Sequence, residues 1–330
     1  MAVTAKLRVH IQEYDGPNEV FRINAAKYGR HSAGDPEIAE RLDVSFGRSE
    51  DDLRAGLVDA EVLVCGHLHH ADLKAGAPRL RWVQSIFAGV DELIPLLSDV
   101  VTLTNGSGLH AQKAGEYGMG AILMLNSAVP HFIEAQRARQ WTQIYTPTVR
   151  GRTVLILGTG RLGGAIARFA QQFGMNVIGV ARTAGARPDF PNCHGVGELH
   201  DLLPRADFLV LIVPNTPATT GLIGRAELDL LPAHAGIVSL GRSQVMDHAA
   251  LIAKLEANEL GGAFLDVFDQ EPLPPDDPLW SVPRVVISPH CTLDDGPGYV
   301  ALALDLFFAN ARRYRAGEPL HNVIDQRRGY

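Results

Sequence analysis

The chain has 330 residues, of which 46% are hydrophobic and 20% are charged, and its formal net charge is −7. This length suffices for two domains, and the composition is that of an ordinary globular protein. The absence of a Lys/Arg-rich run argues against nucleic acid as a partner, because nucleic-acid binders neutralise phosphates with a concentrated basic surface. No window approaches the run of about 20 apolar residues that spans a bilayer, which argues against a membrane partner.

The N-terminal sequence and the cysteines bear on the cell compartment. The segment MAVTAKLRVHIQEY lacks the long apolar stretch of a secretory signal. Cys65, Cys193 and Cys291 lie far apart and form no CxxC pair, which is typical of free thiols in a reducing environment. We therefore expect a cytoplasmic protein.

The first part of the chain alternates short apolar runs with helical segments. We expect strands at 7–11, 61–65, 80–86 and 100–105, and helices at 36–42 and 51–57. A long helix at 111–128, whose small and apolar residues suit burial, is followed by a polar helix at 132–141 and an exposed linker at 146–152. Alternating strands and helices predict a parallel sheet covered on both faces.

A second alternating region begins at Thr153. We expect strands at 153–158, 176–181, 207–213, 236–240, 262–268 and 284–288, with a helix at 162–173. A last helix at 299–315 is expected to return to the first domain. The fold class is thus α/β with two doubly wound parallel sheets, a substrate domain at 1–108 plus 297–330 and an NAD(P)-binding domain at 109–296.

A glycine-rich motif closes the strand TVLIL and opens the next helix. It consists of Gly158, Thr159, Gly160, Arg161, Leu162 and Gly163. The first glycine permits a tight turn, the second allows close approach of a pyrophosphate, and the third allows close helix–strand packing. Methyltransferases and chance loops share this spacing, but the strand–turn–helix setting favours dinucleotide binding.

The end of the second strand of this region bears on cofactor choice. NAD enzymes usually place Asp or Glu there to accept the ribose hydroxyls. Here Ala181 is followed by Arg182 and Thr183, with Arg187 close behind. Arg182 can pair with a 2′-phosphate, so the sequence favours NADP(H) over NAD(H), although a solvated surface arginine is the alternative.

Three polar residues follow later strands at their predicted carboxyl ends. Arg242 follows GIVSLG, Glu271 follows FLDVFDQ, and His290 follows VVISP. Ligands bind beyond these strand ends in a doubly wound sheet. A guanidinium can hold a carboxylate bidentately, an imidazole can transfer a proton at neutral pH, and a neighbouring carboxylate favours and orients the imidazolium. Taken singly, each could be a surface ion pair or a loop cap, but together they indicate catalysis.

Together with the sequence around them, the glycine-rich motif and the three polar residues make the chain resemble the D-isomer-specific 2-hydroxyacid dehydrogenases. Among these it is most similar in type to the glyoxylate/hydroxypyruvate reductases. The resemblance covers nearly the whole chain. It is carried by LGTGRLGGAIA (157–167), LIVPNTPATTGLI (211–223), VSLGRSQVMDHAAL (238–251), FLDVFDQEPLP (264–274) and SPH (288–290). It implies two Rossmann-like domains, with the cofactor domain inserted in the flavodoxin-like substrate domain, and a homodimer formed through the cofactor domain.

The resemblance also implies the roles of individual residues. Arg242 would be the substrate clamp, His290 the general acid/base and Glu271 its partner in reducing a small 2-keto acid to the D-2-hydroxy acid. Asp266 would bind the nicotinamide carboxamide, and His290 would also contact the cofactor. Val213, Pro214 and Leu240 would make the remaining contacts to the cofactor. The backbone amides of Ala88, Gly89 and Val90, in QSIFAGVD, would hold the substrate carboxylate.

Two departures from the family pattern bear on the pocket. Small residues generally follow SPH in the family, whereas Cys291-Thr292-Leu293-Asp294-Asp295 follows here, and Ser239 replaces an asparagine common in the arginine motif. A dinucleotide-sensing regulator on the same scaffold, or a phosphoglycerate dehydrogenase-like enzyme, remains the alternative function. Formate dehydrogenase is disfavoured, because such relatives have Gln where Glu271 stands.

Other histidines and tryptophans are interpreted as structural. His67, His69 and His70 in GHLHH lack a Cys or acidic partner at ligand spacing, so we expect no metal site. His110 precedes the long helix between the domains; facing the cleft is the alternative, but we expect it to cap that helix or to face solvent. Trp82 and Trp141 are expected to be packing residues.

Overall fold

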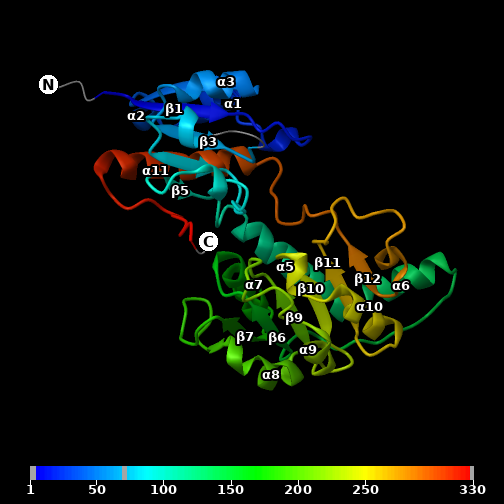
Figure 1. Ribbon diagram of the computed structural model, residues 1–330. Helices are drawn as coiled ribbons and strands as arrows, with labels where there is room; N and C mark the ends of the chain where they lie inside the picture. The colour runs from blue at the N-terminus through cyan, green and yellow to red at the C-terminus, as the bar shows by residue number, and fades with distance from the viewer. Residues whose placement is uncertain (1–4, 69–72, 328–330) are drawn as a thin grey trace. The chain divides into compact units, whose positions relative to one another are not determined.

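The computed structural model describes residues 5–68 and 73–327 (Figure 1). The chain divides into two compact units. The first unit comprises residues 1–109 and 295–330, and the second comprises residues 110–294. The second unit is therefore inserted in the chain of the first, and each is described in turn.

The first unit is built on a five-stranded parallel sheet with the order β2-β1-β3-β4-β5. This order is that of flavodoxin-like sheets. The strands are β1 (Leu7–Gln12), β2 (Leu42–Gly47), β3 (Val62–Cys65), β4 (Trp82–Ser85) and β5 (Thr102–Thr104). The helices are η1 (Glu19–Phe21), α1 (Ala25–Ser32), α2 (Pro36–Ala39), α3 (Glu50–Leu57), α4 (Leu73–Gly76), η2 (Ile94–Leu96) and α11 (Tyr299–Ala316).

Two apolar layers cover this sheet, as expected for strands without a polar face. On one side, α11 buries Tyr299, Phe307 and Phe308 against residues of β1, β3 and β4 (Figure 1). The other layer joins α3 to buried residues of β3 and β4, such as Leu63 and Val83. The last helix thus belongs to the core of the first unit, because burying its aromatic side chains supplies the hydrophobic free energy that fixes it there.

The second unit contains a seven-stranded parallel sheet with the order β12-β11-β10-β9-β6-β7-β8. Its strands are β6 (Thr153–Leu157), β7 (Asn176–Ala181), β8 (Cys193–Gly195), β9 (Phe208–Leu211), β10 (Gly236–Ser239), β11 (Gly262–Leu265) and β12 (Val285–Ile287). The main helices are α5 (Ala111–Asn126), α6 (Val129–Arg137), α7 (Arg161–Gln172) and α10 (His248–Glu256). Shorter ones are η3 (Val196–Glu198), α8 (Leu199–Leu202), η4 (Leu203–Arg205), α9 (Arg225–Asp229), η5 (Ser243–Val245) and η6 (Pro278–Ser281).

This strand order is that of a Rossmann fold, with its switch point between β6 and β9. Helices α5 and α7 lie against each other beside the sheet (Figure 1). Gly115 and Gly118 make this close approach possible, because a Cβ at either position would meet the Phe169 or Ile166 side chain of α7. The predicted fold class, with one doubly wound domain inserted in another, is confirmed.

Some predicted elements are wrong in detail. The sequence analysis missed β2 and extended a helix to residue 42, whereas α2 ends at Ala39 and Leu42 pairs with Leu7 of β1. The polar helix lies at Val129–Arg137 rather than 132–141. Trp82 is fully buried as expected, but the expectation for Trp141 is wrong, since it is 95% exposed beyond the end of α6.

The expectations about thiols and membranes can also be compared with the structure. All three cysteines are free; Cys65 and Cys193 are buried and Cys291 is exposed. Within residues 5–68 and 73–327, no helix has both the length and the apolar character needed to cross a membrane.

Candidate active site

Arg242, Glu271 and His290 meet in one hollow of the second unit. They follow β10, β11 and β12, which are consecutive neighbours in the sheet, so their carboxyl ends lie at one edge. The hollow has a volume of about 250 Å³. Its other lining residues are Ser243, Gln244, Val267, Phe268 and Asp269. The structure therefore brings together the three residues that the sequence singled out.

His290 and Glu271 form a direct pair in this hollow. His290 Nδ1 lies 2.7 Å from Glu271 Oε2, and Glu271 Oε1 accepts a hydrogen bond of 3.0 Å from the Phe268 N–H. Both carboxylate oxygens are thus engaged, which fixes the carboxylate and in turn the ring. His290 also has a φ of 47°, a left-handed conformation that side chains rarely adopt and that is concentrated at functional sites.

Arg242 contributes the positive charge of the hollow. Its Nη1 donates to the Gly241 carbonyl over 2.9 Å, which leaves most of its five N–H donors for a ligand. Gly241 is needed beside it, because a Cβ there would lie 2.8 Å from the Val213 carbonyl oxygen. Arg242 also begins the short helix η5, whose Ser243 hydroxyl donates to Asp269 Oδ1 over 2.6 Å.

Asp269 and Gln244 line the hollow, and the sequence analysis did not single them out. Asp269 stands only two residues before Glu271 in the FDQEP segment, which was the available signal. The Ser243 hydrogen bond holds its carboxylate, and no hydrogen bond joins it to His290. Asp269 therefore adds a negative charge to the hollow without contacting the imidazole.

Asp266 is held at the end of β11 by the segment that departs from the family pattern. It is 1% exposed, and burial raises the pKa of its carboxyl. Its oxygens accept hydrogen bonds from the Ser288 hydroxyl over 2.7 Å, the Thr292 hydroxyl over 2.8 Å and the Cys291 N–H over 3.3 Å. These donors favour the carboxylate and partly offset the effect of burial. Ser239, the other departure, is completely buried on β10.

The glycine-rich loop has the geometry that a dinucleotide requires. Gly158 has a φ of 115°, and a Cβ on it would lie 2.6 Å from the Ile212 carbonyl oxygen. A Cβ on Gly163 would meet the Gly158 carbonyl oxygen, so only glycine allows α7 to start here. Gly160 faces open space and is the N-cap of α7, with no side chain to occupy the first N–H groups of the helix. The site fits an anionic pyrophosphate.

The other predicted cofactor contacts occupy the same edge of the second unit. Thr159 and Leu162 are half-buried and Arg161 is exposed in the loop; Val213 and Pro214 follow β9, next to β6; and Leu240 is buried after β10. Arg182 and Thr183 are exposed after β7, where no carboxylate stands. Arg187 donates to the Thr183 carbonyl over 3.2 Å and to Cys193 Sγ over 3.4 Å, so it stiffens this turn.

Ala88 and Gly89 belong to the first unit and follow β4. Within the described residues their N–H groups make no hydrogen bond, while the Ala88 carbonyl accepts one of 2.6 Å from Asn105 Nδ2. Asn105 is 7% exposed and was not identified from the sequence. It holds a loop whose amides are open to an anion.

The histidines set aside in the sequence analysis have structural contacts. His110 is 8% exposed, and its Nδ1 lies 3.2 Å from the Leu293 carbonyl and 3.3 Å from Asp294 Oδ1. His110 is the N-cap residue of α5, as expected, although its side chain makes no capping hydrogen bond; the expectation of solvent exposure is wrong, because the ring faces these two acceptors. His67 stacks on Phe87 with ring centroids 4.7 Å apart, whereas His69 and His70 lie outside the described residues. No group of metal-ligating side chains occurs among the residues described.

Comparisons with known proteins identify the family. A model of the D-isomer specific 2-hydroxyacid dehydrogenase NAD-binding domain matches residues 119–292. Glyoxylate/hydroxypyruvate reductase A from Salmonella newport (strain SL254) is 31% identical over 263 residues, which cover 76% of this chain and 82% of that protein. The chain belongs to the D-isomer specific 2-hydroxyacid dehydrogenase family.

Solved structures agree with this assignment. A family member from Xanthobacter autotrophicus Py2 in complex with NADPH and MES has a TM-score of 0.84 and 30% identity, covering 99% of this chain and 100% of its own. An NADPH-dependent glyoxylate/hydroxypyruvate reductase from Sinorhizobium meliloti, in complex with NADP and sulfate, has a TM-score of 0.82 and 26% identity. The match covers 98% of this chain and 100% of that chain. The protein is an NAD(P)-dependent 2-hydroxyacid dehydrogenase or reductase, and its relatives support reduction of a 2-keto acid.

Proposed function

We propose that this enzyme reduces a small 2-keto acid of the glyoxylate or hydroxypyruvate type to the D-2-hydroxy acid, with NADP(H) preferred. The observation that carries the proposal is the 2.7 Å contact between His290 and Glu271 in the hollow that Arg242 also lines. The names of the relatives from Salmonella and Sinorhizobium support the substrate class. The second unit is the cofactor domain in this proposal, and the first is the substrate domain.

His290 is the general acid. Its Nδ1 is engaged by Glu271, so Nε2 is the atom left to donate a proton to the carbonyl oxygen as negative charge develops there. The Glu271 carboxylate, 2.7 Å from Nδ1, holds the ring in one orientation. Arg242 holds the carboxylate of the keto acid through its planar donors, and this orients the carbonyl. The open amides of Ala88 and Gly89 are further donors for the same carboxylate.

The residues that would hold the nucleotide are the glycine loop for the pyrophosphate, Asp266 for the carboxamide, and Val213, Pro214 and Leu240 beside the ring. When bound, the nicotinamide supplies the hydride, and the protein supplies position and electrostatics. Arg182 and Arg187 favour a 2′-phosphate over free ribose hydroxyls, since no carboxylate stands after β7 to repel it. The NADPH- and NADP-bound relatives are consistent with that preference.

An initial-rate panel tests the reaction. NADPH and NADH are each combined with glyoxylate, hydroxypyruvate, pyruvate and bulkier keto acids. We expect glyoxylate and hydroxypyruvate, each with NADPH, to give the highest kcat/KM. Replacing Arg182 with Ala is expected to lower the NADPH/NADH ratio of kcat/KM by about tenfold or more, because a charge-assisted phosphate contact is lost. Absence of turnover with every acid would contradict the proposal and favour a nucleotide-sensing regulator.

The role of His290 is tested by His290→Gln. We expect kcat to fall by about 10²–10⁴, the usual contribution of a general acid, with nucleotide affinity nearly unchanged. His200→Gln is the matched control, because His200 also pairs with a glutamate at 2.7 Å in the second unit but lies outside the hollow. Wild-type turnover in His290→Gln would refute the assignment.

We also propose that the enzyme is a homodimer formed through the second unit, as is usual in the family it resembles. Supporting this, Trp141 is 95% exposed and Tyr145 is 88% exposed in the segment after α6, and Ile133 of α6 is 41% exposed. These side chains lie within 13 residues of one another in the sequence, and a contiguous exposed apolar patch is typical of an interaction surface. Light scattering is expected to give the mass of a dimer, and a Trp141→Ser/Tyr145→Ser variant is expected to shift toward the monomer.

A further inference from the structure

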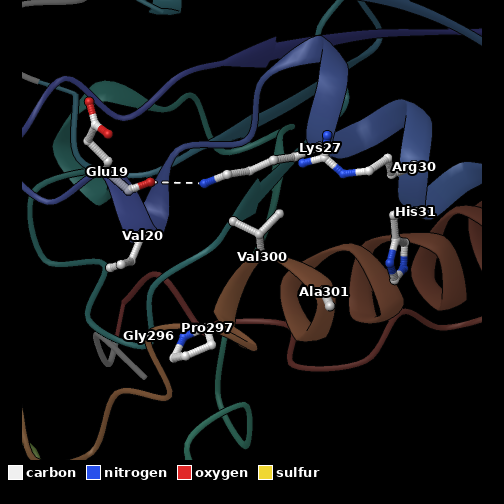
Figure 2. A pocket seen from close by; sticks show the side chains of 9 residues that line it. All are labelled: Glu19, Val20, Lys27, Arg30, His31, Gly296, Pro297, Val300 and Ala301. Atoms are coloured by element: carbon white, nitrogen blue, oxygen red, sulfur yellow. Dashed lines mark hydrogen bonds between the residues drawn. The ribbon is translucent and has the colours of Figure 1, made fainter.

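The first unit contains a groove between α1 and the start of α11. It has a volume of about 590 Å³, within the range of small-molecule sites. Lys27, Arg30 and His31 line it from α1, Val300 and Ala301 line it from α11, and Pro297 lines it from the segment just before α11 (Figure 2). The active-site roles proposed above use none of these residues.

Two of the cationic side chains have unused hydrogen-bonding capacity. Lys27 extends across the groove to the Glu19 backbone carbonyl and donates to it over 2.9 Å, which uses one of three donors (Figure 2). In the part of the chain that the structure describes, the Arg30 guanidinium makes no hydrogen bond or ion pair. Arg30 and Lys27 are three residues apart and so lie on the same side of α1.

The acidic groups nearby are occupied elsewhere. The Glu19 carboxylate pairs with Arg22 Nη1 at 3.2 Å, and Arg22 Nη2 also donates to the Gly16 carbonyl. Asp305 pairs with His31 Nε2 at 3.0 Å. Neither Lys27 nor Arg30 therefore forms an ion pair with a carboxylate of the described residues, although the whole chain carries a formal charge of −7.

Glu19 and His31, which are engaged in the ion pairs just described, also line the groove, and the rest of its lining is apolar. Val300 points up from α11 toward the Lys27 side chain (Figure 2). Val20 of η1 is 41% exposed, and Pro297 and Ala301 are also exposed. A ligand that touches both parts of the groove must therefore carry negative charge at one end and carbon at the other.

We propose that this groove binds a small organic phosphate. The phosphoryl group lies between Lys27 and Arg30, and the carbon skeleton lies against Val20, Pro297 and Val300. A phosphomonoester carries about two negative charges at neutral pH and three acceptor oxygens, which matches two cations. A carboxylate carries only one charge and leaves one cation uncompensated. The guanidinium fork of Arg30 supplies bidentate donors for the phosphoryl oxygens.

The proposal is tested by titration calorimetry, which measures the affinity of the full chain for each probe. Saturating NADP⁺ is present to fill the nucleotide phosphate site. The probes are phenyl phosphate, inorganic phosphate and benzoate. We expect phenyl phosphate to bind most tightly, because only it satisfies both the cations and the apolar surface. Lys27→Met/Arg30→Met is expected to weaken its binding by about a hundredfold, since two charge-assisted contacts are lost.

Two further variants make the result specific. Lys6→Met/Arg54→Met removes the same charge from the first unit outside the groove and is expected to leave the affinity unchanged. Val20→Ser is expected to weaken phenyl phosphate severalfold but not inorganic phosphate. An unchanged dissociation constant in Lys27→Met/Arg30→Met, equal losses in both double variants, or a preference for benzoate would each overturn the proposal.

Discussion

Replacing Glu271 with Gln tests whether the carboxylate acts through its contact with His290. Glu271 accepts hydrogen bonds on both oxygens, from His290 Nδ1 at 2.7 Å and from the Phe268 N–H at 3.0 Å. Gln has one carbonyl oxygen, and its amide nitrogen cannot accept a hydrogen bond. The imidazolium that acts as the acid donates from Nδ1, so with this form of His290 the variant loses one of the two contacts whichever way the amide is turned.

The size of the effect follows from the exposure of the pair. A hydrogen bond to a charged group contributes about 1.5–3 kcal/mol. The two side chains are 44% and 36% exposed, so water screens the interaction and the lower value applies. Because about 1.4 kcal/mol of barrier is tenfold in rate, we expect kcat for the keto acid to fall by about tenfold in Glu271→Gln. Glu271→Ala is expected to lose more, since both contacts disappear.

The assay is the steady-state oxidation of NADPH with varied keto acid and varied cofactor. A positioning role lowers kcat while the KM for NADPH stays unchanged, whereas general unfolding lowers the active fraction and the melting temperature together. Asp269→Asn is the matched control, because Asp269 lines the same hollow and bonds to Ser243 rather than to His290. Wild-type kcat in Glu271→Gln, or an equal loss in Asp269→Asn, would refute the reasoning.

Three other predictions concern cofactor binding and stability. Thr292→Val removes one of the hydroxyl donors to Asp266 and is expected to raise the KM for NADPH severalfold, measured by initial rates; an unchanged KM would contradict the role of this contact. Gly163→Ala is expected to cost about 1–3 kcal/mol in chemical denaturation because its methyl group meets a backbone carbonyl, while Gly120→Ala, with nothing near its Cβ, is expected to gain about 0.5–1 kcal/mol. Burial raises the pKa of Tyr28 to about 12, and its buried hydroxyl has no hydrogen-bond partner in the part of the chain described. The unfolded chain ionises this phenol at lower pH, so stability is lost as pH rises from about 10 toward 12, and Tyr28→Phe is expected to reduce that loss in denaturation curves across this range.

The fold was predictable because most strands are short apolar runs bounded by turn residues. Parallel sheets buried on both faces require such runs. The candidate active-site residues then follow the carboxyl ends of these strands. Strand β2 was missed because its sequence, LDVSFG, is half polar and continues the helical spacing of PEIAERL. Its pairing with β1 is a long-range contact, and local pattern does not encode it.

The residues of the candidate site that follow strand ends were predictable from the sequence, whereas several of the contacts around them were not. Arg242, Glu271 and His290 could be named because strand order places their elements side by side. The Cys291 and Thr292 donors to Asp266 and the contacts of His110 could not be named, because both come from the segment 291–294, whose conformation is set by tertiary hydrogen bonds. The exposure of Trp141 was unpredictable for a related reason, since an aromatic side chain has the same sequence signal in a core as on a surface.

The insertion of the second unit has a consequence for synthesis on the ribosome. Residues 1–109 emerge first, but α11, which brings Tyr299, Phe307 and Phe308 to their sheet, follows only after residues 110–294. At translation rates of about 5–20 residues per second, that interval is on the order of ten to forty seconds. During it the nascent first unit lacks the helix that covers much of one face of its sheet, whereas the contiguous second unit has every strand it needs as soon as β12 has been made.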